Sequence, residues 1–197
     1  MKNKFSSIFK KLALTICIVI TLQSCAAVIV AGAASGAIIA NDRRTAGLLI
    51  EDQNIENKFS SRLAENPAID NSSHLNAVSF NGVLLLVGQT PQQDYKNQIG
   101  DFSRKIPSVK RVHNEVKVSA PNSLMNRSSD SYITSKIKTN MTFEKNFTSS
   151  AIKVVTENGE VFLMGLVSKQ EAEIAIAITK NVDGVQKVVD VFEYIPD

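Results

Sequence analysis

Two stretches of the chain carry the same short pattern, 77 positions apart. Residues 81–88 read NGVLLLVG and residues 158–165 read NGEVFLMG. In both places a helix-start signal and a valine-rich segment follow the pattern. A unit that occurs twice in 197 residues predicts two small tandem domains of one fold, so every residue outside the two copies needs its own explanation.

The first copy begins with a helix and a hairpin. Apolar residues at every fourth position predict a helix, which we expect Asp52 or Asn54 to cap. Residues 75–80 alternate as a half-buried strand does, and residues 83–87 form an apolar return strand. Between them, Asn81-Gly82 supplies the positive φ angles of a tight turn, which makes a β-hairpin the expected structure.

A second helix and a last strand complete the copy. Thr90 as cap and Pro91 at the first helical position predict where this helix begins, and the valines of residues 109–118 predict the strand. The second copy repeats each signal with different residues. These are the helix face of Ile133, Ile137 and Met141, the strand 152–156, the turn Asn158-Gly159, the capping box Ser168–Glu171 and the strand 185–191.

This order of elements predicts the fold class α+β. A hairpin followed by a helical crossover gives a mixed three-stranded sheet with two helices on one face. At about seventy residues, each copy can bury only a modest core. That size favours packing of the two copies against each other, while the sequence leaves open whether they are rigidly docked.

The N-terminus carries an export signal. Residues 1–24 combine a lysine-rich head, an apolar run from Leu12 to Leu22 and small residues before Cys25, which predicts a signal peptide. Residues 22–25 resemble the bacterial lipobox, which implies a lipoprotein acylated, with palmitate for example, at Cys25. The alternative is an ordinary secreted protein with a stray cysteine. The other cysteine, Cys17, leaves with the signal, so the mature chain has no internal disulfide.

Removal of the signal also changes the charge balance. It takes four of the 22 basic residues and none of the 19 acidic ones, which leaves 18 positive against 19 negative side chains. A nearly neutral mature chain gives no indication of nucleic-acid binding. Residues 26–40 are apolar but too short to span a bilayer, so we expect a tether at the lipid surface, with a packing segment as the alternative.

The predicted organisation therefore has five parts. After the signal peptide come a lipidated N-terminus and linker, a first domain, a short linker and a second domain, at residues 25–52, 53–119, 120–129 and 130–197. The glycine and valine pattern of both copies resembles the BON domain. In the second copy it is carried by Gly159, Val161, Leu163, Gly165, Gly184 and Val185.

Two BON domains behind a lipobox resemble the DolP (YraP) family of outer-membrane lipoproteins. The resemblance implies a non-enzymatic protein on the periplasmic face of the outer membrane. It implies binding to anionic phospholipid such as phosphatidylglycerol, recruitment to the division site and support of outer-membrane integrity. Ala26, in place of the aspartate that retains lipoproteins at the inner membrane, resembles the default signal for outer-membrane sorting.

In that family the lipid contact maps to the first helix of the second domain. The matching residues here are Tyr132, Ile133, Lys136, Ile137, Lys138 and Met141. A tyrosine at headgroup depth and lysines at phosphate level suit an anionic bilayer. The alternative is that the three apolar residues are core and the lysines a solvated face. Relatives often carry tryptophan at position 132, and this chain contains none.

Two other classes of function compete with lipid binding. An enzyme is disfavoured because we find no nucleophile elbow, paired metal-ligand histidines or phosphate-binding glycine loop. His74 and His113 are isolated, and we expect no catalytic, cofactor or metal site. An adaptor for envelope proteins, such as the outer-membrane assembly or division machinery, is the serious alternative.

Overall fold

The computed structural model describes residues 42–121, 123–145 and 147–196. The predicted signal peptide, the predicted acylation site Cys25 and the apolar residues 26–40 lie outside the described residues. Among the helices that are described, none has both the length and the hydropathy needed to cross a bilayer.

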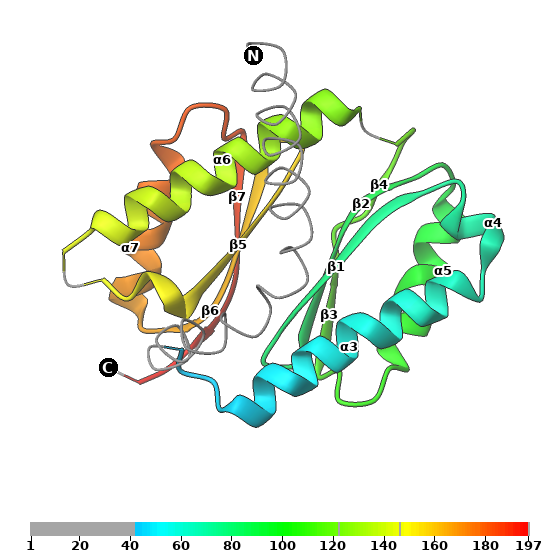
Figure 1. Cartoon of the computed structure of the whole chain (residues 1–197), viewed down its shortest axis with the longest axis horizontal. Coiled ribbons are helices and arrows are strands. Elements are labelled where there is room, and N and C mark those ends of the chain that lie inside the picture. The colour runs from blue at the N-terminus through cyan, green and yellow to red at the C-terminus, as the bar shows by residue number, and fades with distance from the viewer. Residues whose placement is uncertain (1–41, 122, 146, 197) are drawn as a thin grey trace, which may run out of the picture. The chain divides into compact units, whose positions relative to one another are not determined.

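The first domain follows the predicted order (Figure 1). The hairpin, its return strand and the crossover helix are all present, and the last strand is split in two. Its elements are α3 (Ala46–Ala64), α4 (Pro67–Asp70), β1 (His74–Phe80), β2 (Val83–Thr90), α5 (Gln93–Arg104), β3 (Arg111–Asn114) and β4 (Lys117–Val118).

The second domain repeats this plan with a continuous last strand. Its elements are α6 (Leu124–Phe143), the short 3-10 helix η2 (Ser149–Ala151), β5 (Ile152–Glu157), β6 (Glu160–Val167), α7 (Lys169–Lys180) and β7 (Lys187–Tyr194).

Both sheets are mixed, as predicted. β1 and β2 pair antiparallel, while β3 and then β4 pair parallel with β2. β6 likewise pairs antiparallel with β5 and parallel with β7. Asn81 and Asn158 have φ angles of 51° and 52°, which confirms both Asn-Gly hairpin turns. In each domain the two long helices cover one face of the sheet (Figure 1), so the α+β prediction is confirmed.

Three predicted helix starts are wrong. α3 begins at Ala46 under a Thr45 cap, about two turns inside the expected linker. Its early start was missed because Leu48 and Leu49 are only half-buried and the buried Asp52 interrupts the apolar periodicity. α6 begins at Leu124 under a Ser123 cap, so most of the expected linker 120–129 is helical.

The third error concerns α5, which Thr90 does not cap. Thr90 is the last residue of β2, and its hydroxyl oxygen accepts a hydrogen bond from Ser73 Oγ at 2.9 Å. The helix begins two residues later, with Gln92 as a cap residue whose side chain makes no capping bond. The capping box predicted for α7 is confirmed, since Ser168 and Glu171 exchange the two bonds that define it.

The two sheets also share a core. The face of each sheet that its own helices leave uncovered is apolar, and these faces pack together between the domains. This shared core contains Val78, Phe80, Val83, Leu85, Val87, Val155, Phe162, Met164 and Val191. β2 is consequently buried along all eight of its residues. The fragment from residue 42 onward is therefore one unit of four layers, helix, sheet, sheet and helix, rather than two independent domains.

Candidate functional site

Helix α6 is the element on which the predicted site residues lie. One side of it packs over β5, the edge strand of the second sheet. Ile133, Ile137 and Met141 point into the core there and are 3%, 0% and 1% exposed. Because they fill the space between helix and sheet, the expectation that these three side chains reach lipid has to be corrected: they position the helix.

Two further contacts fix α6 in place. Asp130, in its second turn, accepts hydrogen bonds from the backbone N–H groups of Asn158 and Gly159, at 2.8 and 2.9 Å. Gly184 lies so close to the helix that a Cβ there would approach Ile133 Cδ1 to 2.9 Å, and its φ of +92° also favours glycine. The helix is thus held both at the hairpin turn and at the turn before β7.

The opposite side of α6 is exposed. Tyr132 is 65% exposed, and Lys136 follows it by four residues, which places both on one face of the helix. Lys138 is exposed as well, but six residues from Tyr132 correspond to a rotation of about 120° the other way, so it lies on the flank. The structure therefore brings Tyr132 and Lys136 together and sets Lys138 apart.

Two exposed apolar residues that the sequence analysis did not select extend this face. Met125 and Phe143 are 82% and 81% exposed. They stand seven residues before and eleven after Tyr132, so at about 100° per residue all three lie within roughly 20° of one line along the helix. We call this line, with Lys136 beside it, the α6 stripe. Its two ends were missed because the second domain was expected to begin at residue 130 and the residues selected on its first helix ended at Met141.

The lysine of the stripe is only weakly paired. Lys136 Nζ lies 3.3 Å from the carboxylate of Asp183, whose side chain is 97% exposed. Solvent screening leaves such pairs worth about 0–1 kcal/mol, so a phosphate group can replace the carboxylate at little cost. An exposed aromatic ring, two apolar residues and an available ammonium group therefore share one accessible line.

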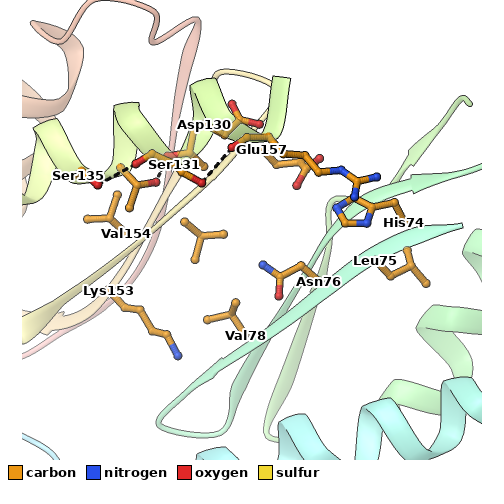
Figure 2. A pocket seen from close by; sticks show the side chains of 14 residues that line it. His74, Leu75, Asn76, Val78, Asp130, Ser131, Ser135, Lys153, Val154 and Glu157 are labelled. Atoms are coloured by element: carbon orange, nitrogen blue, oxygen red, sulfur yellow. Dashed lines mark hydrogen bonds between the residues drawn. The ribbon is translucent and has the colours of Figure 1, made fainter. Parts of the chain in front are cut away.

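The other flank of α6 borders an open cleft of about 660 Å³ between the two domains (Figure 2). Its walls come from the edge strands β1 and β5, and Asn76, Val78 and Lys153 point into it in Figure 2. Ser131 and Ser135 line it from the helix. Its mixed lining contrasts with the apolar stripe, and none of the predicted lipid-contact residues lines it.

The described residues offer no metal centre, since no group of three or more His, Cys, Asp or Glu side chains in them could hold an ion. Of the two histidines, His74 lines the cleft, and the pKa of His113 is lowered by burial and by nearby Arg111.

Comparison with known proteins identifies both domains. The BON domain family model matches residues 51–120 and 129–196. An outer membrane lipoprotein DolP from Haemophilus influenzae is 37% identical over 186 residues, covering 94% of this chain and 96% of that protein. A 21 kDa hemolysin from Actinobacillus pleuropneumoniae is 31% identical over 154 residues, covering 78% and 79%. The chain is thus an outer-membrane, lipid-anchored envelope protein, and it belongs to the DolP (YraP) family of dual-BON lipoproteins.

Proposed function

We propose that the α6 stripe binds the surface of anionic phospholipid bilayers, with phosphatidylglycerol as the model lipid. The observation that carries this proposal is the alignment of Met125, Tyr132 and Phe143 on the exposed side of a helix whose other side is core. Exposed apolar residues scattered singly need no explanation, but a line of three with a lysine beside it fits an interface between water and lipid.

The chemistry of the stripe matches the layers of a bilayer surface. Tyr132 is amphipathic, so its ring can lie below the phosphates while its hydroxyl stays at headgroup depth. Lys136 can reach phosphate oxygens from the same face. Met125 and Phe143 are separated by about 27 Å of helix, which is long enough to contact several lipids.

This lipid contact acts together with the covalent anchor. Acylation of Cys25 holds the protein at the outer membrane, and the stripe then reads the headgroups next to it. The family resemblance extends the proposal to support of outer-membrane integrity and to envelope function at the division site. Recruitment to regions rich in anionic lipid is the physical link between these roles.

Vesicle binding by the fragment Asn41–Asp197, which lacks Cys25, tests the proposal directly. We expect it to co-sediment with phosphatidylglycerol vesicles and not with phosphatidylcholine vesicles, and to dissociate as salt is raised. Each lysine near an anionic surface contributes about 1 kcal/mol, so Lys136→Glu combined with Lys138→Glu should weaken binding at least about tenfold.

A matched control separates local contact from overall charge. Lys58→Glu combined with Lys105→Glu makes the same charge change on exposed lysines of the first domain, and we expect little loss of binding. If a folded Lys136/Lys138 variant bound as wild type does, lipid reading by α6 would be contradicted.

An envelope adaptor is the second candidate, and the open cleft favours it. β1 and β5 are edge strands, so each has backbone N–H and C=O groups without a strand partner on its outer side, and an extended peptide could pair there. Retention by envelope proteins of the assembly or division machinery, together with no binding to protein-free anionic vesicles, would select this function instead.

A further inference from the structure

Two arginines just before α3, Arg43 and Arg44, form hydrogen bonds and ion pairs with both domains. Arg43 reaches the second domain, where Nη1 donates to the carbonyl of Leu166 at 2.7 Å and to Oε2 of Glu171 at 2.7 Å. Its Nη2 donates to Oε1 of Glu171 at 2.6 Å, which completes a bidentate ion pair. These hydrogen bonds lower the pKa of Glu171 and raise that of Arg43.

The next residue binds the first domain. Arg44 is paired with Asp42 at 2.8 Å and with Asp52 of α3 at 2.9 Å, and its side chain is only 10% exposed. Its guanidinium group lies 3.8 Å from the centre of the Phe80 ring. Arg43 therefore binds the second domain and Arg44 binds the first domain. We call residues 42–44 the clamp.

The clamp contacts the second domain at the end where β6 and β7 terminate. Leu166 is near the end of β6, and the next residue pairs with Tyr194 at the end of β7. η2, which follows α6, lies at the same end, since a Cβ on Gly165 would meet the carbonyl oxygen of Ala151. The Phe143 terminus of α6 is therefore at this end too, because Asp130 holds the other part of the helix at the distant Asn-Gly turn.

This end exposes aromatic rings and lysines. Phe143 is 81% exposed and Tyr194 is 53% exposed. Tyr194 stacks edge-on against Phe192 at 6.4 Å, which places its ring on the helix-covered side of the sheet. Lys145, two residues after Phe143, and Lys169, two residues after the end of β6, are both exposed. We call Phe143, Tyr194 and these two lysines the anchored end.

We propose that the clamp holds the anchored end against the phospholipid bilayer, so that α6 contacts lipid first and most deeply at Phe143, with Tyr194 as a second contact outside the helix. This inference rests on the proposed function. Residues 26–40 carry no charged side chain, and from this composition we expect them, beside an acylated Cys25, to favour the lipid interface. Only Asn41 then separates it from Asp42, and one residue spans about 3.5 Å.

The absence of tryptophan from the chain makes the test clean. The mature chain from Cys25 has a single cysteine, so it can be coupled at its natural anchor position to a maleimide lipid in phosphatidylglycerol vesicles. A single tryptophan is then introduced at Phe143, Tyr194, Tyr132 or Met125, all of which are exposed. Val118→Trp in the first domain, 46% exposed, is the control. Quenching by brominated lipid reports contact with the bilayer.

We expect quenching to be several times stronger at positions 143 and 194 than at 125, and absent at 118. Arg43→Ala or Glu171→Gln, checked for folding by circular dichroism, should reduce the difference between positions 143 and 125. Equal quenching at 125, 132 and 143 would overturn the inference while leaving lipid binding by α6 intact. No quenching at any site would overturn both.

Discussion

Asp130 and Asp52 show how much one buried carboxylate contributes to each domain. Asp130 accepts both backbone N–H groups of its hairpin turn, and Asp52 accepts the same pair in the first domain together with the hydroxyl of Ser79. Asp130→Ala leaves the buried N–H group of Gly159 and the partly buried N–H group of Asn158 without their acceptor, so we expect the free energy of unfolding to fall by about 1–3 kcal/mol in urea titrations. Asp52→Ala should cost more, because it also leaves Arg44 without one of its two carboxylates.

Asp183→Ala is the matched control for this pair. Its carboxylate is 97% exposed, so the change in unfolding free energy should stay within about 0.5 kcal/mol. An equal, small effect for all three aspartates would contradict the role assigned to the turns. The sequence could not reveal this role, because the aspartate and its turn lie 28 or more positions apart and meet only in the folded domain.

Glu171 links stability to pH through the clamp. Its folded pKa is lowered by the hydrogen bonds from Arg43, while its ordinary value is 4.5. The stabilisation is therefore fully present above about pH 4.5 and is lost as pH falls through the lower folded pKa. Thermal unfolding followed by circular dichroism from pH 6 to 3 should show a steeper decline for wild type than for Glu171→Gln. Parallel declines would show that the ion pair contributes nothing to stability.

The two crossover helices differ in how they begin. α7 has a complete capping box, so Ser168→Ala should lower the free energy of unfolding by about 1 kcal/mol. α5 starts at Gln92, whose side chain does not cap, and Gln92→Ser should therefore raise it by about 0.5–1 kcal/mol. Chemical denaturation of the two variants measures both changes, and opposite signs are the expected result. A loss of stability in Gln92→Ser would mean that the loop before α5 cannot adopt cap geometry.

The same helices show which elements sequence patterns predict well. The hairpins and the α7 cap depend on residues adjacent in the chain, and both were correctly predicted. The starts of α3 and α6 were placed too late because each first turn is stabilised by a cap residue, Thr45 or Ser123, rather than by an apolar stripe; in α3 the clamp adds an ion pair with Asp52. Missing the start of α6 also concealed Met125, so one end of the candidate stripe depended on a helix boundary.

The shared core makes the two domains stabilise each other. Phe162 is 1% exposed and lies between the two sheets, away from the helices of its own domain. Phe162→Ala should lower the free energy of unfolding by about 3–5 kcal/mol. Because that loss falls on the contact between the domains, we also expect one cooperative thermal transition in wild type to separate into two in the variant. Leu163→Ala, in the core of the second domain alone, is the control. It should lower the stability but keep one cooperative transition, in which the calorimetric and van't Hoff enthalpies of unfolding are equal.

The sequence of β6 does not show which surface covers each face of the strand. A strand that is buried on both faces is a continuous apolar run, whichever surfaces cover it.

Separation of the two domains tests the shared core most directly. A fragment from Ser123 to Asp197 keeps its helices and sheet but exposes Phe162, Met164 and Val155, an apolar face that isolated proteins rarely tolerate. We expect this fragment to bind a hydrophobic dye and to self-associate in sedimentation velocity, and the added first domain to suppress both. A monomeric fragment that binds no dye would mean that the sheet face is not held by the first domain, and the tandem would then be two independent modules.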